Sequence, residues 1–157
     1  MKYRKLTLDE LKTLETQFVQ FLAVNSITGK DWEKIKSSNT PKVEQLLEEF
    51  SDVVLGSVIE KAKYLVNVSA QQLLFFEIQE VGYNIMGISV STAMDFMQYP
   101  TLQNAIEAIP DDARLETFFI QKKYNKAKDL EVFDLMENGC RISDEKTFAE
   151  VKLLIKS

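Results

Sequence analysis

Carboxylates are the one plentiful reactive side-chain type in this sequence, which has 24 Asp and Glu residues, no histidine and one cysteine, Cys140. Without an imidazole there is no histidine-containing catalytic triad and no histidine ligand for zinc, copper or iron. Cys140 has no histidine to activate it, so we interpret it as a structural thiol that packs as a small apolar group. We therefore predict no catalytic residues, no metal site and no cofactor.

The most regular charged pattern is formed by Glu44, Glu48 and Asp52, which recur every four residues along one side of a predicted helix over 41–61. Like charges at this spacing repel each other by a few tenths of a kcal/mol per pair. A basic partner, a hard cation or water could offset this repulsion. The loop spacing of an EF-hand is absent, and so is a Glu-x-x-His pair. We predict a partner-binding face here, with a solvated acidic face as the alternative.

Three aromatic residues, Trp32, Tyr99 and Tyr124, are predicted to belong to the same kind of partner surface, because tyrosine and tryptophan provide large, rigid contact areas. The alternative for each is an ordinary half-buried aromatic side chain. Tyr124 lies inside the densest basic run, residues 121–128. That run is either a solvated strand end or a site for an acidic partner or single-stranded nucleic acid.

The acidic balance of the chain limits its partners. The net charge is −5, the pI is near 4.9, and no glycine-rich phosphate-binding motif occurs. An acidic surface repels nucleic-acid phosphates and anionic lipids, so we expect neither nucleic-acid nor membrane binding. The first ten residues reach acidic side chains before an apolar run forms, and one cysteine cannot make an internal disulfide, so we expect a cytoplasmic protein.

Helices are predicted to open the chain. Thr7 and Glu10 have the spacing of a capping box, and leucine and phenylalanine then recur at helical spacing until about Asn25. A short helix is expected around residues 31–36. Thr40 is expected to cap the helix over 41–61, with Pro41 at its first position.

A sheet is predicted in the middle of the chain. Four segments have the β-branched and aromatic composition of strands, 64–69, 72–79, 83–90 and 115–124, and a short helix is expected over 100–109. Two adjacent aromatic pairs, Phe75-Phe76 and Phe118-Phe119, place one ring on each side of the sheet. We therefore expect helices to cover both faces of the sheet, or a partner to do so.

The last third of the chain is predicted to form a helical hairpin. Its first helix covers 129–138 and ends at Gly139, which suits a left-handed cap, and its second begins at Ser143. Together these patterns predict a single α+β domain over residues 1–157, with N-terminal helices, a roughly four-stranded and mostly antiparallel sheet, and the C-terminal hairpin.

The chain also resembles a family of small uncharacterised bacterial proteins that is defined only as a domain of unknown function. The resemblance covers most of the length and rests on these short segments: Met1-Lys2-Tyr3-Arg4 with Leu6-Thr7, Phe21-Leu22, Ser26-Ile27-Thr28, Trp32, Phe50-Ser51-Asp52 and Tyr64-Leu65. It implies a stand-alone cytosolic protein of bacterial origin. It implies no activity and no functional residues.

Two functions remain open. The first is a non-catalytic interaction domain, an adaptor or inhibitor-like protein that binds a protein partner or associates with itself. The second is a small-ligand-binding protein or an unusual histidine-free enzyme that works with carboxylate, Tyr and Lys side chains. A deep cavity holding a carboxylate with a strongly perturbed pKa would favour the second, whereas a filled core and an exposed apolar patch would favour the first.

Overall fold

A computed structural model describes residues 1–91 and 93–156 of the chain. Helices and one antiparallel sheet make up the fold, which confirms the predicted α+β class. The residues group into two compact units, Met1–Glu60 and the part of the chain from Lys61 onward. A single domain over 1–157 stays a prediction.

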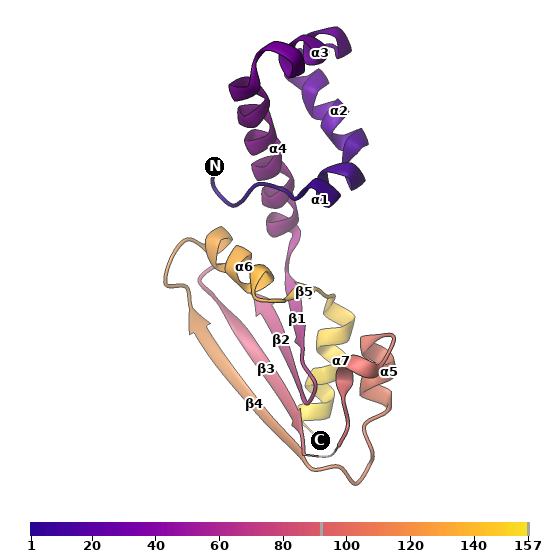
Figure 1. Cartoon of the computed structure of the whole chain (residues 1–157). Helices are drawn as coiled ribbons and strands as arrows, with labels where there is room; N and C mark the ends of the chain where they lie inside the picture. Colours follow the sequence, from indigo (N-terminus) through magenta and orange to yellow (C-terminus); the bar gives the residue numbers. More distant parts are fainter. Residues whose placement is uncertain (92, 157) are drawn as a thin grey trace. The chain divides into compact units, whose positions relative to one another are not determined.

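The first unit consists of helices (Figure 1). They are α1 (Leu8–Thr13), α2 (Glu15–Val24), α3 (Gly29–Ser38) and α4 (Thr40–Lys61). The capping box at the start of α1 is confirmed, because the Thr7 side chain accepts from the Glu10 amide and the Glu10 side chain accepts from the Thr7 amide. The continuous helix predicted up to Asn25 is divided at Leu14, where the backbone leaves helical geometry and the Leu14 amide is shared between the carbonyls of Glu10 and Leu11.

The cap of α4 differs from the prediction. Thr40 is the first helical residue, and the Asn39 side chain accepts from the Lys42 amide at 3.2 Å. Asparagine is as good an N-cap as threonine, and its side-chain oxygen reaches the third helical amide. The helix therefore begins one residue earlier than predicted.

Aromatic side chains from three helices form the centre of the first unit. The Phe18 ring lies 5.0 Å from the fully buried Phe50 and 5.2 Å from Trp32, in edge-to-face arrangements, and Phe21 lies 5.4 Å from Phe50. Such pairs add about 0.5–1.5 kcal/mol each to the free energy of apolar burial. This cluster holds α2, α3 and α4 together.

The second unit contains a five-stranded sheet in the order β4-β3-β2-β1-β5. The strands are β1 (Tyr64–Val68), β2 (Gln72–Ile78), β3 (Gly82–Val90), β4 (Leu115–Lys123) and β5 (Arg141–Ile142), and all neighbours are antiparallel. The four predicted strands are confirmed to within one residue at each end. The fifth, β5, was not predicted.

Helices accompany the sheet in the second unit. They are the 3₁₀ turn η1 (Phe96–Gln98), α5 (Leu102–Glu107), α6 (Lys128–Glu137) and α7 (Glu145–Lys156). The short helix expected over 100–109 is confirmed as α5, which is two residues shorter at each end, whereas η1 precedes that range and was not predicted. Strand β5 interrupts the expected hairpin of α6 and α7. Gly139 follows the end of α6 with a left-handed φ of 99°, as predicted.

The helices cover the two faces of the sheet unequally. Phe148 and Val151 of α7 and Ala105 of α5 pack with Phe75 and Met86 in the core of one face. Helix α6 lies against the other face (Figure 1), where the charge of its Glu131 reaches Tyr83 of β3. At β2 both faces are covered as predicted, since Phe75 and Phe76 are buried.

Candidate functional site

Strand β4 forms one edge of the sheet, and among the described residues its only strand neighbour is β3. Figure 1 shows it as the outermost strand of the second unit. It is nine residues long, and every residue except the half-buried Phe118 is exposed. A long exposed edge presents a row of backbone donors and acceptors to which another strand can pair.

The hydrogen bonds at the two ends of β4 show which of its backbone groups face outward. The Tyr124 amide donates to the Val81 carbonyl at 3.3 Å, and the Ser91 amide donates to the Arg114 carbonyl at 3.4 Å. Both residue pairs continue the register of β3 and β4 by one position beyond its two ends. Hydrogen-bonded pairs alternate along an antiparallel ladder, so the even-numbered residues of β4 bond to β3. The amides and carbonyls of residues 115, 117, 119, 121 and 123 therefore point to the open edge.

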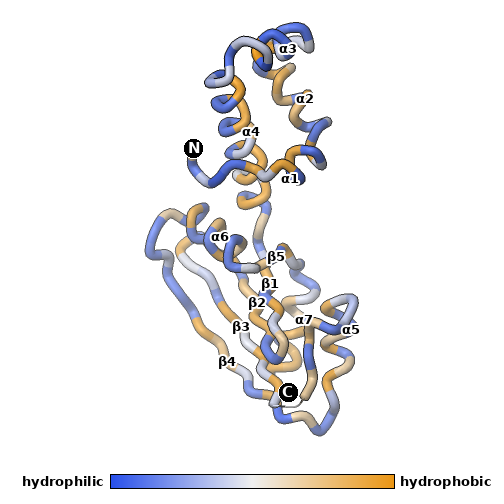
Figure 2. The backbone as a smooth tube through the Cα atoms, in the orientation of Figure 1, coloured by the Kyte–Doolittle hydropathy of each residue, from blue (hydrophilic) through white to orange (hydrophobic). Residues whose placement is uncertain are grey.

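The side chains in the middle of this edge are apolar. In the middle of the strand Phe119 is 52% exposed and Ile120 is 42% exposed, and Leu115 at the first position of the strand is 37% exposed. Figure 2 shows an apolar middle segment of β4 between more hydrophilic ends. Phe119 stands beside the buried Met86 and Ile120 beside Ile85, so apolar surface is exposed on both faces of the strand.

The usual protections of a sheet edge are missing from this middle segment. Natural edges carry charges, prolines or bulges that prevent pairing with another chain. In β4 the charged residues are Glu116 near one end and Lys122 and Lys123 at the other, and the pairing with β3 runs without a bulge from Leu115 to Lys123. We call residues 115–123 with their outward-facing backbone groups the β4 edge.

The acidic stripe predicted from the sequence is held by the N-terminal segment. Glu44 forms an ion pair with Lys5, and the hydrogen bond in this pair raises the pKa of the Lys5 ammonium. Asp52 accepts hydrogen bonds from the amides of Lys2 at 2.7 Å and Tyr3 at 3.0 Å. The half-buried Glu48 adds its negative charge beside Lys5. The stripe thus serves contacts within the first unit, and its binding to a partner stays a prediction.

The three predicted aromatic residues lie in separate places. Trp32 is half-buried on Phe18 in the first unit, with the Lys36 ammonium 5.8 Å from its ring centre. Tyr124 directly follows β4, and its hydroxyl donates to the Gln79 carbonyl at 2.5 Å. Burial raises the pKa of Tyr124. Tyr124 therefore fixes the end of the β4 edge, and it is the one predicted site residue that adjoins this edge.

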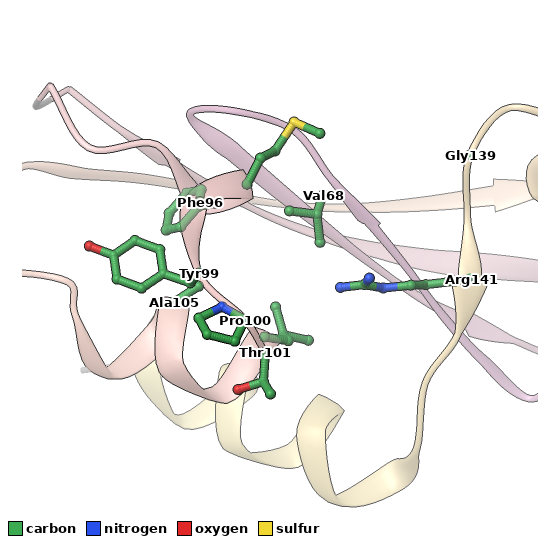
Figure 3. Close-up of a pocket in the computed structure, with 10 residues that line it drawn as sticks. Val68, Phe96, Tyr99, Pro100, Thr101, Ala105, Gly139 and Arg141 are labelled. Atoms are coloured by element: carbon green, nitrogen blue, oxygen red, sulfur yellow. The ribbon is translucent and has the colours of Figure 1, made fainter.

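Tyr99 lies at a hollow of about 190 Å³ between η1, α5 and β5. Figure 3 shows Arg141 of β5 extending its guanidinium towards Pro100 and Thr101, with Val68 beside it. The described residues that line the hollow include this one cation and the Tyr99 phenol, but no carboxylate and no lysine. The hollow does not assemble the acid and base groups that the enzyme hypothesis requires.

The described residues contain no group of three or more histidine, cysteine, aspartate or glutamate side chains that could hold a metal ion. None of the helices formed by the same residues is long and apolar enough to cross a membrane.

The position of β4 in the sheet was not predicted. The sequence did indicate a strand over 115–124 and a Phe118-Phe119 pair that needs cover on both faces, but strand order does not follow from local patterns. The structure shows that the cover is absent at Phe119, because β4 lies at the edge.

Comparisons with known proteins place the chain in a family. Neither the comparison with curated proteins nor that with solved structures finds a match. A family of unknown function, DUF6495, matches residues 1–156, which is almost the whole sequence. The chain therefore belongs to this family of unknown function, as its resemblance to a domain of that kind predicted.

Proposed function

We propose that this protein is a non-catalytic interaction domain of the bacterial cytosol, which binds a polypeptide by adding a strand to the β4 edge. The observation that carries the proposal is the nine-residue edge strand, whose odd-numbered backbone groups point outward and whose middle exposes Phe119 and Ile120.

Strand addition fits both kinds of exposed group at this edge. The added strand would supply partners for the outward amides and carbonyls, and its side chains would cover apolar surface on both faces. Backbone hydrogen bonds provide affinity in this mode of recognition, and the side-chain contacts on alternate residues provide specificity.

The core and the carboxylates favour this function over catalysis. The main core of the second unit is filled by side chains such as Phe75, Phe96 and Met86. The carboxyl group of Glu10 has its pKa lowered to about 2 by the Arg4 guanidinium and the Thr7 amide, but it belongs to the capping box of α1. Its perturbation is explained by helix capping and does not indicate an active site.

The proposed compartment and partner class rest on composition. The one cysteine, Cys140, is buried as a free thiol, which suits a reducing compartment. The net charge of −5 disfavours nucleic acid, so the proposed partner is a protein. The bacterial origin rests on the resemblance described above.

The proposal is tested by asking whether any polypeptide, a second copy included, associates through the β4 edge. The tagged full-length protein and its Phe119→Lys variant are expressed in the native host and crosslinked at near-physiological salt. Mass spectrometry then identifies the crosslinked chains and the sites of linkage. A charge at the centre of the edge should prevent pairing, because natural edges use lysine in this way.

The matched control is Val24→Lys, which also replaces an exposed apolar residue with lysine but lies on α2 in the first unit. We expect crosslinks from residues 115–123 to a polypeptide in the wild type and in Val24→Lys, and their loss in Phe119→Lys. Crosslinks that persist in Phe119→Lys, or the absence of any crosslink at these residues in the wild type, would contradict the proposal.

A further inference from the structure

We infer, building on the proposed function, that the added strand is β4 of a second copy, paired antiparallel about a twofold axis at Phe119. In this arrangement residue 119 faces residue 119 of the second copy, and the numbers of every facing pair are symmetric about 119. The full strand from Leu115 to Lys123 is then paired.

The charges of β4 are self-complementary in this register. Glu116 faces Lys122 of the second copy, and the twofold axis produces this pair twice. Opposite charges directly across an antiparallel pair stabilise it, whereas like charges destabilise it. Within the chain, Glu116 and Lys122 stand opposite the uncharged Ser89 and Tyr83 of β3, so the proposed contact gives each its charge complement across a strand.

Other registers lose this complementarity. A parallel arrangement in register would place Lys122 against Lys122 of the second copy. A shift of the antiparallel pair by two residues in one direction would place Lys122 against Arg114, and a shift in the other direction would place it against Phe118. Of these registers, only the one centred on Phe119 places Glu116 of each copy opposite Lys122 of the other and pairs the strand over its full length.

The backbone directions agree with this register. Residues with outward-facing groups have odd numbers in β4, and the proposed pairing sets 115 against 123, 117 against 121, and 119 against 119. Hydrogen-bonded pairs of an antiparallel ladder need both residues to face each other, which these pairs satisfy. A shift by one residue would set outward-facing groups against groups that already bond to β3.

The same pairing covers the exposed apolar side chains. On one face the two Phe119 rings become neighbours, and on the other face Phe118 stands opposite Ile120 of the second copy. Aromatic and β-branched residues are favourable partners across a strand pair. The apolar centre is then flanked on that second face by the two Glu116–Lys122 pairs.

The inference is tested by charge reversal, with the mass of the purified full-length assembly measured by sedimentation equilibrium over a range of concentrations. The wild type should approach twice the chain mass of 18.0 kDa as its concentration rises. Glu116→Lys and Lys122→Glu should each raise the dimer dissociation constant about tenfold or more, because each variant turns two attractive pairs into two repulsive ones.

An equal mixture of these two variants distinguishes the proposed register from a general charge effect. In the mixed dimer, the lysines of one chain face the glutamates of the other at both pairs, so a 1:1 heterodimer should form as tightly as the wild-type dimer. The double variant Glu116→Lys/Lys122→Glu should also recover dimerisation. Lys123→Glu is the matched control, since it changes the net charge by the same amount as Lys122→Glu but faces Leu115.

The outcomes separate the inference from the proposed function. A wild type that stays monomeric throughout, or single variants that are not rescued by mixing, would overturn the inference. If crosslinks at residues 115–123 then join the protein to a different polypeptide, the proposed function still holds and only the second copy is wrong. If neither experiment finds a polypeptide at the β4 edge, the inferred dimer and the proposed function are both wrong.

Discussion

The ring of Phe118 on β4 occupies the space that a Cβ atom on Gly87 of β3 would need. A Cβ built on Gly87 would lie 2.0 Å from Cε1 of Phe118, and the two residues stand directly opposite each other in the sheet. Phe118 is thus the one half-buried residue of the β4 edge. This contact anchors the strand to β3 while the neighbouring Phe119 stays exposed.

Gly87→Ala should destabilise the protein through this contact. The added methyl group collides with the ring, and overfilling a packed site typically costs about 1–3 kcal/mol of unfolding free energy. Urea denaturation should therefore show a lower midpoint. In a Phe118→Ala background the same change should cost close to nothing, because the colliding ring is gone.

Gly82→Ala is the control for this double-mutant cycle of Gly87→Ala and Phe118→Ala. A Cβ on Gly82 would lie 2.0 Å from the backbone carbonyl oxygen of Lys122, which no side-chain truncation removes. Its cost should be the same with or without Phe118. If Gly87→Ala lowered the unfolding free energy equally in the wild type and in the Phe118→Ala background, the contact between Gly87 and Phe118 would be contradicted.

Ser51 should be essential to the attachment of the N-terminal segment. Its side chain is fully buried, accepts from the Leu6 amide at 3.0 Å and donates to the Leu47 carbonyl at 2.7 Å. Ser51→Ala leaves the Leu6 amide without its acceptor, which should cost about 1–3 kcal/mol in chemical denaturation. Ser57→Ala, at an exposed position of the same helix, should change stability by less than about 0.5 kcal/mol. Equal effects of the two changes would contradict the buried hydrogen bond.

Glu10 should make stability depend on pH in the acid range. Its pKa is lowered from 4.5 to about 2, first by the hydrogen bond from Arg4 and then by the Thr7 amide. The ionised carboxylate therefore stabilises the fold above pH 4.5, and this contribution is lost as the pH falls through about 2. Since the Glu10 side chain is 38% exposed, solvent screening limits the contribution to about 1 kcal/mol.

Thermal unfolding of the wild type and Glu10→Gln between pH 2 and pH 6 checks this prediction. The stability difference should be largest near pH 6 and should shrink towards pH 2. Asp9→Asn removes a neighbouring carboxylate of the same helical turn that is outside the capping box, and serves as the control. A difference between the wild type and Glu10→Gln that does not vary with pH would refute the role of Glu10.

Cys140 should react slowly with alkylating reagents in the folded protein. Burial raises the pKa of its thiol, which lowers the fraction of reactive thiolate, and the side chain is almost inaccessible. Iodoacetamide labelling at pH 8, followed by mass spectrometry, should be at least about tenfold slower in buffer than in denaturant. Similar rates in both conditions would indicate an accessible thiol.

Local patterns were sufficient to predict much of this fold. The Thr7–Glu10 capping box, the left-handed Gly139 and the four long strands follow from residue types and short spacings. The break at Leu14 was missed because the apolar stripe continues through it. Strand β5 was missed because its two residues carry no periodic pattern. Its pairing is tertiary, with Leu65 opposite Ile142 and the Ser143 amide bonded to the Tyr64 carbonyl at 2.8 Å.

The candidate site was harder to predict than the fold. The sequence identified β4 as a strand, but its position at the edge depends on which strand pairs with β3, and local patterns do not encode that choice. The acidic stripe was recognisable from Glu44 and Asp52, yet its contacts with Lys5 and the Lys2 amide join residues about forty to fifty positions apart. Separations of this size leave no local signal.

The most direct test of the β4 edge is residue-resolved amide hydrogen exchange of the full-length protein, measured from low to high concentration and after crosslinking in the native host. Amides of the even-numbered residues 116 to 122 should be protected throughout, because they bond to β3. Those of residues 117, 119 and 121 should exchange fast in dilute solution and become protected when a strand is added. Amides at these three positions that stay fast under every condition would contradict binding at this edge.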